Sequence, residues 1–247
     1  MWLKSKPDEL VLARRLSQNF IEFKEFYEHE RGRAGQIVWR IDSNLEFKIP
    51  GAHAASRTHP DTGIHEICLT KYPVDSTDAF VVAHEIMHSI FKEENTSLLI
   101  RNRGSRFANV NNYLSTMLED YSVDLFLHKN YHFDLSKEYV RRLFNIKPES
   151  CIEPIDSLER LESAIFLTTS MIKWRLIDDS TAERKWNKFL NDYKRVCPKV
   201  FSMSCCLEGL AKKLETLEER RDAFINIVKN CQIYNEPLEK FLYLDNN

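Results

Sequence analysis

The sequence predicts an α+β fold: a small, mostly antiparallel sheet packed on a helix that carries two histidines, followed by a largely helical C-terminal half. Glycine is scarce, with six in 247 residues, which favours helices joined by short polar turns over a series of hairpins. All glycines except Gly209 lie before residue 105, so we expect any sheet to lie in the first half. Beyond Ser136, apolar residues recur with helical spacing.

The N-terminal part is predicted to form one helix followed by strands. Over 7–30, Pro7 fits the first helical position and apolar residues recur at spacings of three and four. Short segments rich in β-branched and aromatic residues come next and are typical of strands. These predicted strands cover residues 36–41, 45–49 and 64–70.

A run of helices is predicted over the rest of the chain. The first, at about 78–92, follows a polar stretch in which Asp75, Ser76 or Thr77 can cap the helix. Further helices are expected at about 111–130, 137–144, 155–176, 181–193 and 205–230. Prolines at positions 148 and 154 favour a boundary between a first domain, 1–148, and a helical domain or extension, 149–247.

Composition limits the function classes. The net charge of −2 gives no strong electrostatic footprint for nucleic acid, and no apolar stretch approaches the ~20 residues of a membrane span. The first residues show no apolar signal region, so we expect a cytoplasmic protein with six reduced cysteines. Cys205 and Cys206 are expected to be buried. No CxxC pair exists, which argues against a thiolate zinc site.

One motif carries chemistry: His84-Glu85-Ile86-Met87-His88, inside the predicted 78–92 helix. Histidines four apart on a helix share a face, with Cβ atoms about 6 Å apart, so both imidazoles can reach one zinc ion at ~2.0–2.1 Å. Glu85 lies about 100° further round the helix. From there it can take a proton from a zinc-activated water without binding the metal itself. This pattern favours a zinc hydrolase with one Zn²⁺ per chain over two unrelated histidines.

A catalytic zinc needs a third protein ligand, and the helix predicted at 111–130 offers candidates. Asp120 and Asp124 stand four apart on one face, so one acid can bind zinc while the other orients a ligand histidine. We favour Asp120 as the ligand, with Asp124 in the supporting role. Glu119 is the rival ligand, pointing about 100° away. His128 and His132, also four apart, are further candidate ligands.

The run Val81–Phe91 around the HExxH motif resembles the zincin metallopeptidases. In their gluzincin branch, which includes IrrE/ImmA-like proteins, a downstream glutamate is followed four residues later by Asp or Asn. Here Asp120 stands at the glutamate position, with Asp124 four residues later. The resemblance covers roughly residues 36–135, and it implies a zincin-like catalytic domain whose strand before the motif, here 64–69, pairs with an extended substrate.

The resemblance implies a zinc metallopeptidase that hydrolyses peptide bonds in a protein or peptide substrate. His84, His88 and Asp120 would bind zinc and Glu85 would be the general base. A metal-dependent hydrolase of non-peptide substrates stays open, as does a non-catalytic regulatory or interaction protein in which the metal is structural. Glu85 argues against the regulatory protein, because a purely structural site needs no base beside it.

Overall fold

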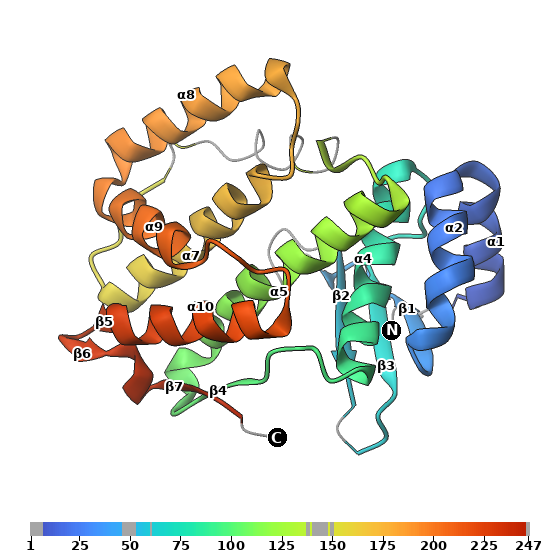
Figure 1. The fold of residues 1–247 in the computed structure, drawn as a ribbon, viewed down its shortest axis with the longest axis horizontal. Helices are drawn as coiled ribbons and strands as arrows, with labels where there is room; N and C mark the ends of the chain where they lie inside the picture. Colours follow the sequence, from blue (N-terminus) through green and yellow to red (C-terminus); the bar gives the residue numbers. More distant parts are fainter. Residues whose placement is uncertain are drawn as a thin grey trace. The chain divides into compact units, whose positions relative to one another are not determined.

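The computed structural model describes residues 7–45, 53–59, 61–136, 139, 148 and 151–245. Over these residues the chain has the predicted α+β fold, with small sheets and a largely helical C-terminal half (Figure 1). It divides into two compact units. The first comprises Met1–Ser97 with Phe126–Phe133, and the second comprises Leu98–Leu125 with Asp134–Asn247. This division falls elsewhere than residue 148, and a domain boundary at 148 stays a prediction.

The first unit begins with two helices, α1 (Glu9–Asn19) and α2 (Ile21–Glu30). The prediction of a single helix is wrong at Phe20, whose φ of −134° and ψ of 109° are extended. The apolar spacing nevertheless continues across the break, since Leu16 and Phe23 are both buried. Apolar periodicity therefore could not distinguish one helix from two in contact.

A mixed sheet follows, made of β1 (Ile37–Ile41), β2 (Ala54–Thr58) and β3 (His65–Leu69) in the order β1-β3-β2. β3 pairs parallel with β1 and antiparallel with β2. The strands predicted at 36–41 and 64–70 are confirmed, whereas residues 46–49 of the third lie outside the described residues. The 64–69 segment is the central strand, so its predicted role as the strand that pairs with substrate is wrong.

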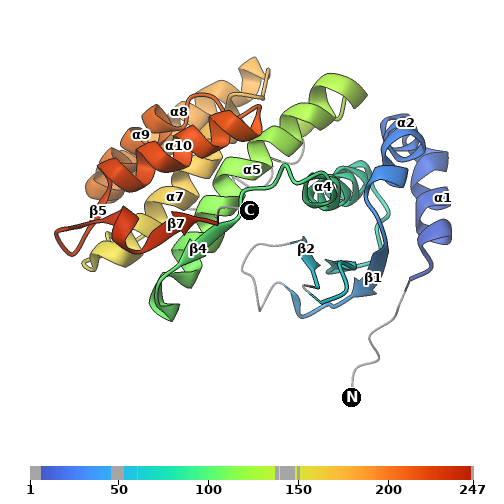
Figure 2. The same ribbon diagram turned by 60° about the horizontal axis from the view of Figure 1, so that its bottom comes forward.

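The helix with the histidines is α4 (Ser76–Glu93), which packs on β2 and β3 (Figure 2). Its start is fixed by a capping box: the Asp78 backbone N–H donates to Asp75 Oδ1 at 2.8 Å, and Asp78 Oδ2 accepts the Asp75 N–H at 3.3 Å. The predicted cap is thereby confirmed. One face of α4 supplies core side chains, among them Ala79, Val82, Ala83, Ile86, Met87 and Ile90.

The second unit is mainly helical, and most of its helices lie side by side (Figure 1). They are α5 (Ala108–Tyr131), which belongs to this unit as far as Leu125, α7 (Ser157–Trp174), α8 (Ser180–Val196), α9 (Pro198–Leu210) and α10 (Leu217–Asn230). The prediction of one helix over 205–230 is wrong, because α9 stops at Leu210 and Thr216 caps a new helix in a capping box with Glu219. The helix predicted at 137–144 falls on residues that, apart from Tyr139, lie outside the described ones.

Short strands also occur near the C-terminus, contrary to the expectation that the sheet is confined to the first half. They are β5 (Gln232–Ile233), β6 (Glu236–Pro237) and β7 (Leu242–Leu244), and a further short strand, β4 (Ile100–Asn102), lies in the first half. β4 pairs antiparallel with β7, and β5 with β6. Tyr234 and Asn235 form the β5–β6 turn with φ values of 52° and 63°. A left-handed turn without glycine is uncommon, which is why the scarcity of glycine gave the wrong expectation.

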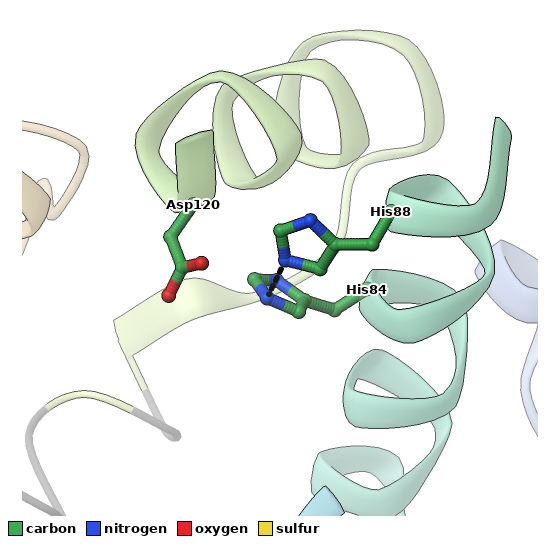
Figure 3. A group of neighbouring side chains, drawn as sticks. All are labelled: His84, His88 and Asp120. Atoms are coloured by element: carbon green, nitrogen blue, oxygen red, sulfur yellow. Dashed lines mark hydrogen bonds between the residues drawn. The ribbon is translucent and has the colours of Figure 1, made fainter. Parts of the chain in front are cut away.

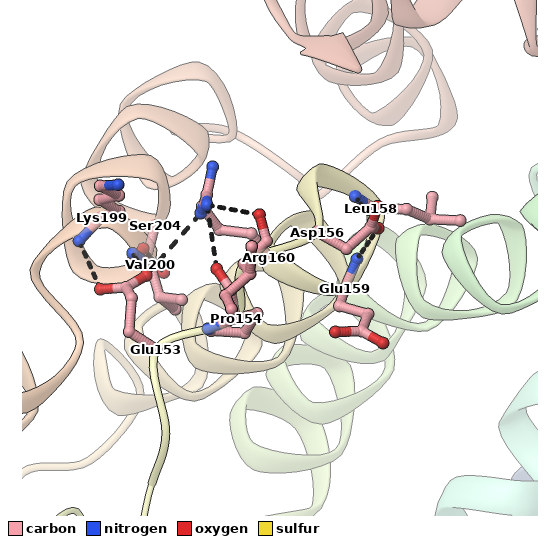
Figure 4. A network of polar contacts seen from close by, with 10 residues as sticks. Glu153, Pro154, Asp156, Leu158, Glu159, Arg160, Lys199, Val200 and Ser204 are labelled. Atoms are coloured by element: carbon pink, nitrogen blue, oxygen red, sulfur yellow. Dashed lines mark hydrogen bonds and ion pairs between the residues drawn. The ribbon is translucent and has the colours of Figure 1, made fainter. Parts of the chain in front are cut away.

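α9 begins without a side-chain cap from its own N-cap residue, Cys197. Glu153 takes that role: its carboxylate accepts the backbone N–H of Lys199 at 2.9 Å and of Val200 at 3.2 Å (Figure 4). Arg160 lies 3.8 Å from the same carboxylate. A carboxylate at this position satisfies two helix N–H groups and complements the positive end of the helix dipole.

We expect Glu153→Ala to lower the free energy of unfolding by about 1 kcal/mol, the usual cost of losing a helix cap. Glu153→Gln keeps an oxygen acceptor but loses the charge, so it should fall between the alanine variant and the wild type. Urea unfolding followed by circular dichroism measures the difference. Equal stability of all three proteins would show that the carboxylate does not cap α9.

Two further expectations concern membrane-spanning helices and the exposure of two cysteines. None of the described helices combines the length and the apolarity that a membrane crossing needs. Cys205 and Cys206 are exposed, so the expectation that they are buried is wrong. The buried face of α9 is defined by Val200, Ser204 and Leu207, and the two cysteines fall on the other side of the helix.

Candidate metal centre

The first two candidate ligands lie on one face of α4. His84 and His88 are partly exposed, while Ile86 and Met87 between them are buried. The centroids of the two imidazole rings are 4.7 Å apart, and the ring of Phe80 lies 5.9 Å from that of His84. The amphipathic pattern of α4 therefore places both imidazoles beside the apolar core, where they can turn towards a common point.

The two imidazoles do turn towards each other. His84 Nε2 and His88 Nε2 are 3.0 Å apart, close enough for a hydrogen bond in which either ring can donate, according to its tautomer (Figure 3). Two nitrogens bound to one tetrahedral zinc at 2.0–2.1 Å would lie ~3.3–3.4 Å apart. The observed separation thus needs only a small adjustment for both nitrogens to bind one ion.

Asp120 completes a group of three possible ligands. One ligand atom from each of His84, His88 and Asp120 lies within 4.8 Å of the others (Figure 3). The carboxylate of Asp120 is largely buried, with 8% of the residue exposed. A buried acid beside two histidines at this spacing can hold a metal ion.

α5, the helix that carries Asp120, is anchored at its C-terminal end within the first unit. The Tyr131 ring meets Phe26 edge-on, with centroids 5.4 Å apart, and its hydroxyl donates to Glu30. Just beyond the helix, the Phe133 ring lies 6.0 Å from Phe80 on α4. Asp120 belongs to this same uninterrupted helix.

Within the second unit, Asp120 and Asp124 share a buried lysine. Lys173 Nζ on α7 lies 2.6 Å from Asp120 Oδ2 and 3.4 Å from Asp124 Oδ2. Asp124 is fully buried and also accepts a hydrogen bond from the Tyr139 hydroxyl. The acidic pair singled out in the sequence is therefore part of a buried polar cluster rather than a solvated helix face.

Glu119, the rival ligand, has different surroundings. Although it is buried, the group of three possible ligands does not include it. It lies close enough to the fully buried guanidinium of Arg220 to interact with it electrostatically. Burial lowers the pKa of Arg220, whereas Glu119 and Glu219 act in the opposite direction. Glu119 thus acts on the pKa of Arg220 within the second unit, while its own Oε1 is buried without a hydrogen-bond partner among the described residues.

His128 and His132, which the sequence also allowed as ligands, lie at the C-terminal end of α5. His128 Nδ1 is 3.0 Å from the Phe133 carbonyl oxygen, and His132 adopts a left-handed conformation with φ of 59° just after the helix. Such a conformation is typical of a helix C-terminus. Among the described residues, the group of possible metal ligands includes neither histidine.

The histidine on the central strand has a structural environment. His65 is buried, with Nδ1 2.8 Å from the Thr58 hydroxyl and Nε2 2.8 Å from Glu93 Oε1.

Two residues of the buried polar cluster around Asp120 and Asp124 were not predicted from the sequence: Lys173 and Tyr139. Lys173 gave a signal, since it interrupts an apolar stretch of a predicted helix, but Tyr139 gave none.

Two imidazoles and one carboxylate match the chemistry of a zinc site. Zinc is commonly bound by two histidines and one acid in hydrolases, with a fourth position left for water or substrate. Glu85 adjoins His84 on α4 and is 8% exposed, so a buried acid accompanies the three possible ligands. Comparisons with protein families, with curated proteins and with solved structures found no match to this chain.

Proposed function

We propose that this protein is a zinc-dependent peptidase in which His84, His88 and Asp120 bind the metal and Glu85 is the general base. The observation that carries the proposal is the grouping of three ligand atoms within 4.8 Å, in a chain where a glutamate directly follows the first histidine. Among the described residues the group has three members, whereas structural zinc sites are closed by four protein ligands, so the group favours an open catalytic site.

Each residue of the proposed site has a distinct task. When bound, zinc supplies an open coordination position and the Lewis acidity that activates water and polarises a carbonyl. Glu85 takes the proton from the attacking water and returns it to the leaving amine. To hold the ion, His84 and His88 would each present an unprotonated Nε2, the atoms that are now within hydrogen-bonding distance of each other.

The sheet supports a peptide as the substrate. β2 packs against α4 and, among the described strands, pairs only with β3. An exposed strand edge can pair with an extended peptide through backbone hydrogen bonds, largely independent of the peptide's sequence. β2 therefore takes the place of the 64–69 segment as the strand proposed to bind substrate.

Metal removal tests the proposal. The zinc-loaded protein should cleave members of a quenched fluorescent peptide library; incubation with a chelator followed by dialysis should abolish cleavage, and stoichiometric zinc should restore it. Loss of the ion that activates water removes the whole catalytic pathway, so the residual rate should equal the background. Mass spectrometry of the products identifies the bond that is cleaved.

Three outcomes would count against this function. If the protein binds zinc but cleaves neither peptides nor folded proteins, the non-catalytic regulatory protein is favoured. Turnover that survives complete removal of metal would place the reaction at a different site. Zinc-dependent hydrolysis confined to ester or amide substrates that are not peptides would retain the metal chemistry and replace the substrate class.

A further inference from the structure

Lys173 is an unusual residue for its position. It lies near the C-terminal end of α7 with 9% of its surface exposed, next to the fully buried Ile172. Lysine is almost never buried unless its charge is paired. Its ammonium lies 2.6 Å from Asp120 Oδ2, which is the distance of a short charge-assisted hydrogen bond. The side chain therefore reaches the proposed third zinc ligand directly.

Further groups hold the ammonium in place. Asp124 Oδ2 is 3.4 Å from Lys173 Nζ, and the Tyr139 ring lies 5.2 Å from it, within the range of a cation–π contact. The Tyr139 hydroxyl donates to Asp124. The Asp124 carboxylate and the Tyr139 ring thus hold the Lys173 ammonium in the position from which it contacts Asp120.

We propose that Lys173 is a positioning residue for the metal site: by holding one oxygen of Asp120, it makes this carboxylate a ligand that binds through its other oxygen. The inference rests on the proposed function, because it concerns the same metal. A carboxylate that binds through one oxygen keeps the coordination number low, which an open catalytic site requires. Partners that orient a ligand in this way are a general feature of metal sites.

Two physical effects of Lys173 oppose each other, and they predict opposite results. Its positive charge repels a divalent cation, so removing it should tighten metal binding if charge dominates. If positioning dominates, removal releases the Asp120 carboxylate from its fixed orientation, which weakens metal binding. Loss of a partner that orients a ligand typically costs about 10–100-fold in metal affinity, and we expect this effect to win.

Lys173→Met, Lys173→Arg and the control Lys188→Met provide the test. Lys188 is an exposed lysine of the same unit, and it pairs with Asp192. Lys188→Met therefore changes the net charge of the protein by the same amount as Lys173→Met. Zinc affinity is measured by competition with a chromogenic chelator, and coordination by the visible spectrum of the cobalt-substituted protein. We expect Lys173→Met to bind zinc about 10–100-fold more weakly, with a weaker cobalt spectrum that indicates a higher coordination number.

Lys173→Arg keeps a cationic donor and should retain most of the affinity, while Lys188→Met should match the wild type. If Lys173→Met does not fold, Lys173→Gln decides by the same loss of affinity, because its amide is uncharged and one bond shorter than the lysine side chain that reaches Asp120. Unchanged or tighter binding together with the wild-type cobalt spectrum would overturn the positioning role. Failure of the wild type itself to bind zinc would instead overturn the proposed function, so the two failures are distinguishable.

Discussion

Replacing both His84 and His88 by alanine is expected to abolish metal binding. The wild type should contain about one zinc per chain, as for a mononuclear catalytic site, and the variant none above background. The physical reason is that the two imidazoles supply two of the three possible ligands, and a single carboxylate does not retain zinc against dialysis. Elemental analysis of both purified proteins measures the difference.

The fold should survive this change. Both side chains are partly exposed, and the core face of α4 is formed by apolar residues such as Ile86 and Met87. Alanine also has the highest helix propensity. Far-ultraviolet circular dichroism of the variant should therefore equal that of the wild type, and loss of zinc can then be assigned to the missing ligands.

A second histidine pair provides the matched control. His128→Ala/His132→Asn also removes two histidines four apart, and asparagine suits the left-handed backbone at position 132. This variant should keep its zinc. Zinc lost here but retained without His84 and His88 would move the metal site to the end of α5, which the sequence left open.

The part of the site that could be predicted from the sequence is local. His84 and His88 share a face because of helical geometry alone, and the helix that carries them is started by Asp75 and Asp78, which lie a few residues before the motif. No contact distant in sequence was needed for either inference. For the same reason the bounds predicted for α4, 78–92, differ from Ser76–Glu93 by only one or two residues.

The choice of third ligand depends on distant residues. Asp120 and Glu119 are neighbours on one helix, and their surroundings differ because Asp120 is paired with Lys173 while Glu119 interacts electrostatically with Arg220. Both cations come from helices far along the chain, α7 and α10. Helical spacing predicts that the two acids point in different directions, but the packing of the helices determines which cation lies near each acid.

The errors in the predicted fold have a similar cause. One extended residue, Phe20, separates α1 from α2 without disturbing the apolar pattern. β7 pairs with β4 across more than a hundred residues, and both strands are too short for a period of two to be recognised. The end of α9 was missed although the capping box of Thr216 and Glu219 marks the start of α10 in the sequence itself.

Glu85→Gln is expected to retain zinc and to lose peptidase activity. The two side chains have nearly the same size, and Glu85 is not one of the grouped ligands, so the metal content should stay at the wild-type level. The amide cannot accept the proton of the attacking water. Loss of general-base catalysis should lower kcat by about 10²–10⁴-fold, measured on a peptide that the wild type cleaves.

Glu93→Gln tests whether the effect belongs to position 85 or to any acid on α4. Glu93 lies on the same helix and bonds His65, and glutamine can keep that hydrogen bond, so this variant should retain wild-type turnover. Wild-type turnover by Glu85→Gln would refute the general-base role while leaving the metal site intact. If Glu85→Gln lost its zinc together with its activity, Glu85 would instead be a zinc ligand or a residue that holds a ligand in place. Only zinc retained with turnover lost assigns the proton transfer to Glu85, because it separates holding the metal from performing the reaction.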